Sequence, residues 1–291
     1  MTWDKAVTRF LAEKHLSAGT RRVYRLTLDR VGGHLPVQDL DGLTGDDLAA
    51  ALAAAYPEAS PASWNRHVAT LRSFAAWADR GGLVSARVVS TLDRRREGVD
   101  HRRALSREQV EAVLSDRRLS VRDRCLFRMM YETAARAQEV LCLNVEDLDQ
   151  PRKRATTIRK GGAVDILHWQ TGTARVLPYV IAGRGLGPLF VADRPPSLTR
   201  APAARDLDPA TGRARLSYRR AAEVFTEISG GATLHQLRHS AITHLAEEGV
   251  PLPLLMAKSR HESLKTLQRY ARPSTEAVAE LTAAHDPARR R

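Results

Sequence analysis

The chain has 291 residues and a formal net charge of +13, with a sequence pI near 10.5. Its length suits two modest domains, each with its own core, and its charge favours a polyanionic partner, nucleic acid before others. Its two cysteines, Cys125 and Cys142, and its apolar runs, which charges interrupt, argue against a disulfide framework, a signal peptide and a membrane span.

The expected protein is therefore cytoplasmic, and both cysteines are expected in its core. The first 92 residues predict a helical domain of about four helices. Ser17 precedes one run of apolar residues at helical spacing, and a second run covers residues 43–55. Ser63 precedes a third run, which Gly81 ends.

Residues 93–103 almost lack apolar side chains and are strongly charged. Such a composition is typical of a solvated linker rather than a packed element, so we place the boundary between two domains here. A basic linker that lies against DNA phosphates explains the same residues equally well.

Residues 104–291 predict a second domain, which is mostly helical. Capping-box patterns open three of its helices, at Ser106, Ser120 and Thr233. Another helix is expected near residues 251–258, where an apolar run follows a glycine and a proline.

Within the second domain the hydrophobic period changes to that of strands. Residues 156–158 and 164–166 flank the pair Gly161-Gly162 and predict a β-hairpin. A last amphipathic helix is expected over residues 275–285. The predicted fold class is mainly α (α+β), with a small antiparallel β-sheet in the second domain.

Six residues of the second domain form a pattern in which the joint order is the informative part. His235 and Arg238 lie three residues apart near the start of a capped helix, so both side chains can meet one anion. Taken alone, each of the six also has an ordinary explanation as a surface, turn or core residue. In chain order the set is Arg136, Lys160, His235, Arg238, His261 and Tyr270.

Together these residues resemble the tyrosine recombinase, or phage integrase, family. The segment TAARAQEVLCLNVEDLD is similar to the family's first arginine box, RKGG to its hairpin lysine, LHQLRHSAITHLAEEGV to its second box and RHESLKTLQRY to its nucleophile segment. The resemblance is strong over residues 104–275, and residues 1–92 are more loosely similar to the family's core-site-binding domain. It implies a site-specific DNA recombinase whose catalytic domain covers residues 104–291.

The residue types suit transesterification at a phosphodiester. Arg136 and Arg238 would hold nonbridging oxygens through charge-assisted hydrogen bonds and stabilise the charged transition state. A tyrosine hydroxyl has a pKa near ~10, so Tyr270 needs positive neighbours or a proton acceptor to attack at neutral pH. His235 is the candidate acceptor, and His261 the candidate donor to a phosphoryl oxygen.

Lys160, at the hairpin tip, is the candidate general acid that protonates the leaving 5′-oxygen. Arg159 is its rival, because the second strand lacks the basic residue that is common in the family. The resemblance implies a 3′-phosphotyrosyl intermediate, no metal or other cofactor, and four copies that act on two double-stranded DNA sites. Motifs for nucleotide or zinc binding are not evident in the sequence.

Several residues near the six have open roles. Glu139 either orients Arg136 or is an ordinary exposed glutamate, and His239 is similarly ambiguous. Arg260 stands where the family usually has Gly, which leaves the pose of His261 open, and it is a candidate for an added phosphate contact. The candidates for DNA contact are Arg159, Arg260, Arg21, Arg22 and Arg66.

Two other functions remain compatible with the sequence. A non-catalytic DNA-binding regulator would keep the fold and the basic surface, although retention of all six residues argues against it. A topoisomerase would use the same tyrosine chemistry to relax strands without exchanging them. The Ala-rich and Arg-rich composition of GC-rich coding also explains part of the positive charge.

Overall fold

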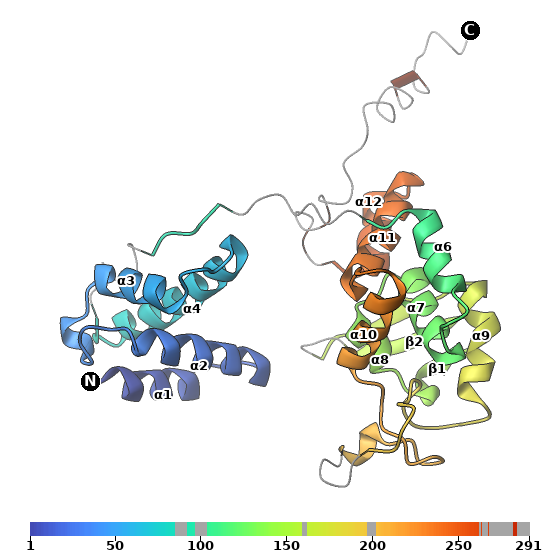
Figure 1. Cartoon of the computed structure of the whole chain (residues 1–291), viewed down its shortest axis with the longest axis horizontal. Coiled ribbons are helices and arrows are strands. Elements are labelled where there is room, and N and C mark those ends of the chain that lie inside the picture. The colour runs from blue at the N-terminus through green and yellow to red at the C-terminus, as the bar shows by residue number, and fades with distance from the viewer. Residues whose placement is uncertain are drawn as a thin grey trace. The chain divides into compact units, whose positions relative to one another are not determined.

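The computed structural model describes residues 1–84, 92–96, 104–158, 162–196, 202–261, 263, 267 and 282–283. The chain divides into two compact units, Met1–His101 and Arg102–Arg291, and each has its own hydrophobic core (Figure 1). The division lies within the charged segment 93–103.

The elements of the first unit are all helices in its described residues. Its elements are α1 (Trp3–Glu13), α2 (Ala18–Gly32), the 3-10 turn η1 (Leu40–Gly42), α3 (Gly45–Ala55) and α4 (Pro61–Arg80). The hydroxyls of Ser17, Thr44 and Ser60 each accept a hydrogen bond from the backbone N–H three residues later, which starts α2, α3 and α4. The cap of α4 is therefore Ser60 rather than the expected Ser63, because Pro61 occupies the first helical position.

Aromatic side chains from α1 and α4 form the centre of the first core. The ring centroids of Trp3 and Phe74 lie 4.8 Å apart, and Phe10 meets Phe74 edge to face at 5.5 Å. The indole N–H of Trp3 donates to the carbonyl of Leu28 on α2. Leu26, which fits the apolar pattern of α2, is nevertheless exposed.

Residues 92–96 pack against α4. Leu92 is buried in the first core, and the side-chain amide of Asn65 bonds both the backbone N–H and the carbonyl of Arg95, each at 2.8 Å. The guanidinium of Arg95 lies 3.7 Å from the ring centroid of Trp64. Residues 93–96 are exposed, and the buried Leu92, the last residue of the expected first domain, together with Arg95 holds them against the helix.

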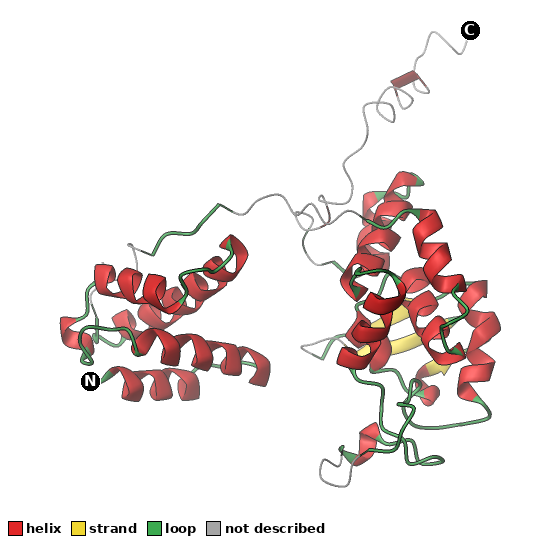
Figure 2. Ribbon diagram, viewed as in Figure 1, coloured by secondary structure: helices red, strands yellow, loops and turns green. Residues whose placement is uncertain are grey.

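The second unit combines helices with one small sheet (Figure 2). Its elements are α6 (Arg107–Ser115), α7 (Val121–Thr133), α8 (Ala137–Leu141), η2 (Val145–Asp147), β1 (Leu148–Asp149), β2 (Arg154–Ile158), β3 (Val164–His168), α9 (Thr171–Ile181), η4 (Ala204–Asp206), α10 (Tyr218–Ile228), α11 (Leu234–Glu247) and α12 (Leu252–Ser259). The strands are antiparallel in the order β1-β2-β3. The mainly α (α+β) class and the hairpin are confirmed, and β1 is a strand that the sequence pattern did not predict.

The predicted helix starts of the second unit are confirmed. Ser106 and Thr233 each form a capping box with the glutamine three residues later, and Ser120 accepts from the N–H of Asp123. None of the described helices is long and apolar enough to cross a membrane. The helix expected over residues 275–285 lies outside the described residues, apart from residues 282–283, which are helical.

Helix α7 is the central element of the second unit. It contacts α6, α8, α9, α10, α11 and β3, and its residues Leu126, Phe127 and Met130 are fully buried. The buried carboxylate of Glu132 accepts hydrogen bonds from the backbone N–H groups of Gln170 and Thr173, which fixes the start of α9 against α7. Helix α11 lies beside α6, α7 and α12 (Figure 1).

The two cysteines differ in their surroundings. Cys125 is buried in α7, as expected, and burial raises the pKa of its thiol to about 12. Cys142 is exposed, so the prediction of a core position is wrong for this residue. It caps the C-terminus of the short helix α8, between the buried Leu141 and Leu143.

Candidate active site

Four of the six predicted catalytic residues lie in the described part of the chain. Arg136 is the N-cap of α8, His235 and Arg238 lie in the first turns of α11, and His261 follows the end of α12. Lys160 and Tyr270 lie outside the described residues, as does Arg159.

Arg238 is anchored at the point where the ends of α7 and α12 meet. Its Nη1 donates to the carbonyl of Ala134 and its Nη2 to the carbonyl of Ser259, both at 2.7 Å. Only 3% of Arg238 is exposed. Carbonyls at helix C-termini have no partner within the helix and carry partial negative charge, so this site suits a buried guanidinium.

Arg136 is held from the protein side by Glu139. The guanidinium Nη1 lies 2.7 Å from Oε1 of Glu139, and the backbone N–H of Arg136 donates to Oε2 at 3.0 Å. Glu139 is 8% exposed, whereas the side chain of Arg136 is 49% exposed. Although burial opposes ionisation, the hydrogen bonds from Arg136 hold the pKa of Glu139 below its ordinary value. The interpretation of Glu139 as an ordinary exposed glutamate is wrong.

Arg260 faces the protein interior, in contrast to the expected phosphate contact. It caps α12 in the left-handed conformation, with φ 56° and ψ 40°, and its side chain is 5% exposed. Its Nη2 lies 3.2 Å from Oε2 of Glu139, and its Nη1 donates to the carbonyl of Lys258 at 2.8 Å. The turn before His261 thus has the backbone conformation that glycine adopts easily, and the arginine keeps it.

The hydrogen bonds of His261 define its tautomer. The hydroxyl of Ser259 donates to the carbonyl of Leu255 at 2.5 Å, so its oxygen accepts from Nδ1 of His261 at 2.7 Å. Nε2 then carries the lone pair, and Nη2 of Arg238 lies 3.5 Å from it. In this neutral form Nε2 is a proton acceptor.

Burial and positive neighbours keep His261 neutral. Burial, followed by the charges of Arg238, Arg136 and Arg260 in that order, lowers the pKa of His261 to about 4. His235, exposed at the start of α11, lies close enough to lower the pKa of His261 further, so it belongs to the same cluster. The structure therefore brings these two histidines together with both predicted catalytic arginines.

The low pKa of His261 predicts a loss of stability in mild acid. Unfolded histidine titrates near ~6.5, so between about pH 6.5 and pH 4 the unfolded chain binds a proton that the folded chain does not. We expect the free energy of unfolding to decrease as the pH is lowered through this window, and to decrease less steeply in His261→Gln. Urea unfolding at neutral pH and near pH 5 measures both slopes. His244, whose pKa burial also lowers, titrates in both proteins and contributes equally to both slopes. Equal slopes in the two proteins would therefore contradict the assignment of the low pKa to His261.

The remaining described candidates are His239 on α11 and three arginines of the first unit. His239 is half-buried on α11, and its Nδ1 lies 3.3 Å from the hydroxyl of Thr243 one turn later. Arg21 and Arg22 on α2 and Arg66 on α4 are exposed in the first unit. Their side chains are thus accessible for contact with a partner.

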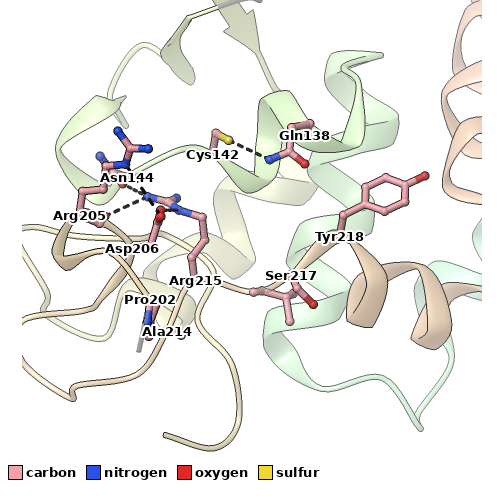
Figure 3. A pocket seen from close by; sticks show the side chains of 11 residues that line it. Gln138, Cys142, Asn144, Pro202, Arg205, Asp206, Ala214, Arg215, Ser217 and Tyr218 are labelled. Carbon is pink, nitrogen blue, oxygen red and sulfur yellow. Dashed lines mark hydrogen bonds and ion pairs between the residues drawn. The ribbon is translucent and has the colours of Figure 1, made fainter. Parts of the chain in front are cut away.

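A pocket of about 590 Å³ lies over the end of α8 and the start of α10 (Figure 3). None of the four predicted catalytic residues in the described part of the chain, Arg136, His235, Arg238 and His261, lines it. Arg215 donates from Nη1 to the carbonyls of Leu141 at 3.0 Å and Leu143 at 2.9 Å, and from Nε to Asp206 at 2.8 Å. This partly buried arginine therefore ties η4 to the end of α8, a structural role that the sequence pattern did not predict.

The chain matches two family models. The model described as "Phage integrase family" matches residues 103–277, and the model described as "Phage integrase, N-terminal SAM-like domain" matches residues 7–82. Tyrosine recombinase XerC of Mycobacterium sp. (strain JLS) is 30% identical over 300 residues, which cover 97% of each chain. Tyrosine recombinase XerD of Mycobacterium leprae is 27% identical, and the match covers 95% of this chain and 94% of that protein.

Solved structures share the fold. A lambda integrase tetramer bound to a Holliday junction superposes with a TM-score of 0.74 at 15% identity, over 94% of this chain and 80% of that one. The Tn1549 transposon integrase in complex with circular intermediate DNA superposes with a TM-score of 0.72 at 16% identity, over 97% and 99%.

Proposed function

The chain belongs to the phage integrase family of tyrosine recombinases, which act in site-specific DNA recombination, and we propose that it cleaves and rejoins DNA by attack of Tyr270 on a phosphodiester. One observation carries the proposal. Two guanidiniums, those of Arg136 and Arg238, lie in one cluster with His235 and His261, and each guanidinium is oriented by acceptors of the protein itself.

The two arginines suit the binding of a scissile phosphate. A guanidinium offers five N–H donors in a planar fork, which matches two oxygens of a phosphate. Glu139 and the carbonyl of Ala134 fix the two forks before DNA binds, so little reorganisation is needed as charge develops on the phosphate. Arg136, at 49% exposure, is the one accessible from solvent.

The covalent step transfers one strand end to the protein. The hydroxyl oxygen of Tyr270 forms a bond to phosphorus while the bond from phosphorus to the 5′-oxygen breaks, which leaves a 3′-phosphotyrosyl link. The tyrosine proton passes to His235, and Lys160 protonates the leaving 5′-oxygen. A 5′-hydroxyl of a second strand then reverses the step, so the bond energy is conserved.

His261 can donate to a phosphoryl oxygen only in some forms of its ring. In the neutral ring the proton is on Nδ1 and faces Ser259, so Nε2 donates only if the ring gains a second proton or takes the other tautomer. A bound phosphate anion raises the pKa of a neighbouring histidine and thereby favours the protonated ring.

Double-stranded DNA is the proposed substrate, and four copies are the proposed working assembly. The net charge of +13 attracts phosphates, and exposed arginines of the first unit, such as Arg21 and Arg66, offer contacts to the backbone. The lambda integrase of similar fold is a tetramer on a Holliday junction, which supports the same arrangement for this chain.

A covalent-capture experiment tests the proposed chemistry and needs no defined target sequence. The protein is incubated with lightly nicked genomic DNA from its own organism, because a nick beside the cleaved bond lets the small fragment diffuse away and traps the adduct. We expect an adduct that resists detergent, is released by protease and occurs at few sequences. Binding without an adduct would instead favour a regulator, and plasmid relaxation without strand exchange a topoisomerase.

Removal of divalent cations gives a second prediction. We expect EDTA to leave the rate of adduct formation unchanged, because Arg136 and Arg238 supply the positive charge that a metal ion would otherwise supply. A magnesium-dependent nuclease that is inactive in the same buffer confirms that chelation is complete. A loss of adduct that added Mg²⁺ restores would contradict a metal-independent step.

A further inference from the structure

Arg260 occupies a backbone position that disfavours its residue type. The left-handed conformation at φ 56° brings the Cβ of any residue except glycine close to the following carbonyl, which is unfavourable. Its guanidinium is also largely withdrawn from solvent, since the side chain is 5% exposed. Two unfavourable features in one residue call for a compensating role of its side chain.

The contacts of Arg260 join the anchors of both predicted catalytic arginines. Nη2 lies 3.2 Å from Oε2 of Glu139, whose other oxygen holds Arg136. The same Nη2 lies 3.3 Å from the carbonyl of Ala134, which also accepts from Nη1 of Arg238. A single guanidinium thus touches the acceptor of each of the other two.

The charges around Arg260 suit such a junction. Burial lowers the pKa of its guanidinium, and the negative charges of Glu139 and Asp165 oppose that shift. Glu139 is therefore shared by two guanidiniums, one half-exposed and one buried. When Arg136 binds a phosphate, the carboxylate remains held by Arg260 and keeps its position.

We propose that Arg260 is a positioning residue of the active site, which links Glu139 and the Ala134 carbonyl and thereby fixes Arg136 relative to Arg238. This role rests on the proposed function of the two arginines. Arg260 acts through its neighbours, and it contacts no DNA.

The variant Arg260→Gly tests the role. Glycine accepts the left-handed backbone without strain, so the fold is expected to be kept. At saturating DNA we expect the single-turnover rate of adduct formation to fall by about 10–100-fold, as for other residues that orient a catalytic group, with little change in the DNA dissociation constant. Arg260→Lys keeps the charge but lacks the planar fork. Its rate is expected to lie between those of the wild type and Arg260→Gly.

Two further variants separate positioning from a purely structural contribution. Ala182→Gly relieves the same left-handed strain at the end of α9, where φ is 50°, and is expected to cleave at the wild-type rate. In the Glu139→Gln background, Arg260→Gly is expected to change the rate by less than about 3-fold, because the residue acts through Glu139.

The outcomes are distinguishable. If the wild type forms no adduct, the proposed function fails and the role of Arg260 fails with it. If the wild type reacts and Arg260→Gly reacts equally fast, only the role of Arg260 is overturned. It is equally overturned if the loss of rate is the same with Gln at residue 139, or if DNA affinity falls as much as the rate does.

Discussion

The variant Arg238→Ala is expected to form the adduct about 10²–10³-fold more slowly and to be less stable than the wild type. The loss of rate follows from removal of a fixed guanidinium beside the phosphate, since one such donor contributes about 10²–10³-fold. The loss of stability follows mainly from the carbonyl of Ser259, which loses a buried donor at a cost of about 1–3 kcal/mol, whereas the carbonyl of Ala134 keeps its hydrogen bond from Arg260. Single-turnover cleavage and urea unfolding measure the two effects.

A second, partly buried arginine that also bonds two backbone carbonyls supplies the control for Arg238→Ala. The side chain of Arg215 is 14% exposed and donates to the carbonyls of Leu141 and Leu143, but it lines the separate pocket. We expect Arg215→Ala to be destabilised, and the folded protein to cleave at about the wild-type rate. Equal losses of rate in the two variants would mean that Arg238 contributes through folding alone.

The variant Tyr270→Phe is expected to form no detectable adduct, at least ~10⁴-fold below the wild type, because it lacks the attacking oxygen. Removal of one hydroxyl leaves the charge and the shape of the side chain almost unchanged. DNA affinity and thermal stability are therefore expected to remain at wild-type values.

A surface tyrosine provides the matched control. Tyr179 on α9 is 76% exposed, and Tyr179→Phe makes the same chemical change at a site away from the cluster. We expect this variant to cleave at the wild-type rate. Adduct formation at full rate in Tyr270→Phe would refute the assignment of the nucleophile.

Local sequence patterns predicted the elements that begin with a side-chain signal. Ser17, Ser106, Ser120 and Thr233 cap helices because their hydroxyls bond the N–H three residues on, a rule that depends on short-range sequence alone. The hairpin was likewise visible as two β-branched runs around glycines. The order of arginines and histidines in the second unit predicted the family, which the family models confirm.

Tertiary contacts were the part that the sequence did not reveal. Arg238 is anchored by two backbone carbonyls. Every residue has such a carbonyl, so no residue type in the sequence marks these two acceptors. The pairing of Arg260 with Glu139 joins residues far apart in the chain, so no local period reports it. The sequence alone therefore makes Arg260, next to His261, a candidate for a phosphate contact, whereas its side chain is buried.

The same limit explains the misplaced cysteine. Cys142 lies in an apolar run, but α8 ends there after five residues and leaves the thiol exposed. Its neighbours Leu141 and Leu143 are both buried, so the exposure of this one side chain is not determined by local composition.

Identification of the residue that carries DNA is the most direct test of the central claim, that Tyr270 attacks the phosphodiester. The trapped adduct is digested with protease and nuclease, and the peptide that bears a nucleotide is sequenced by mass spectrometry. We predict a nucleotide linked through its 3′-phosphate to the peptide that contains Tyr270. A nucleotide on any other residue, or a link through the 5′-end, would contradict the account.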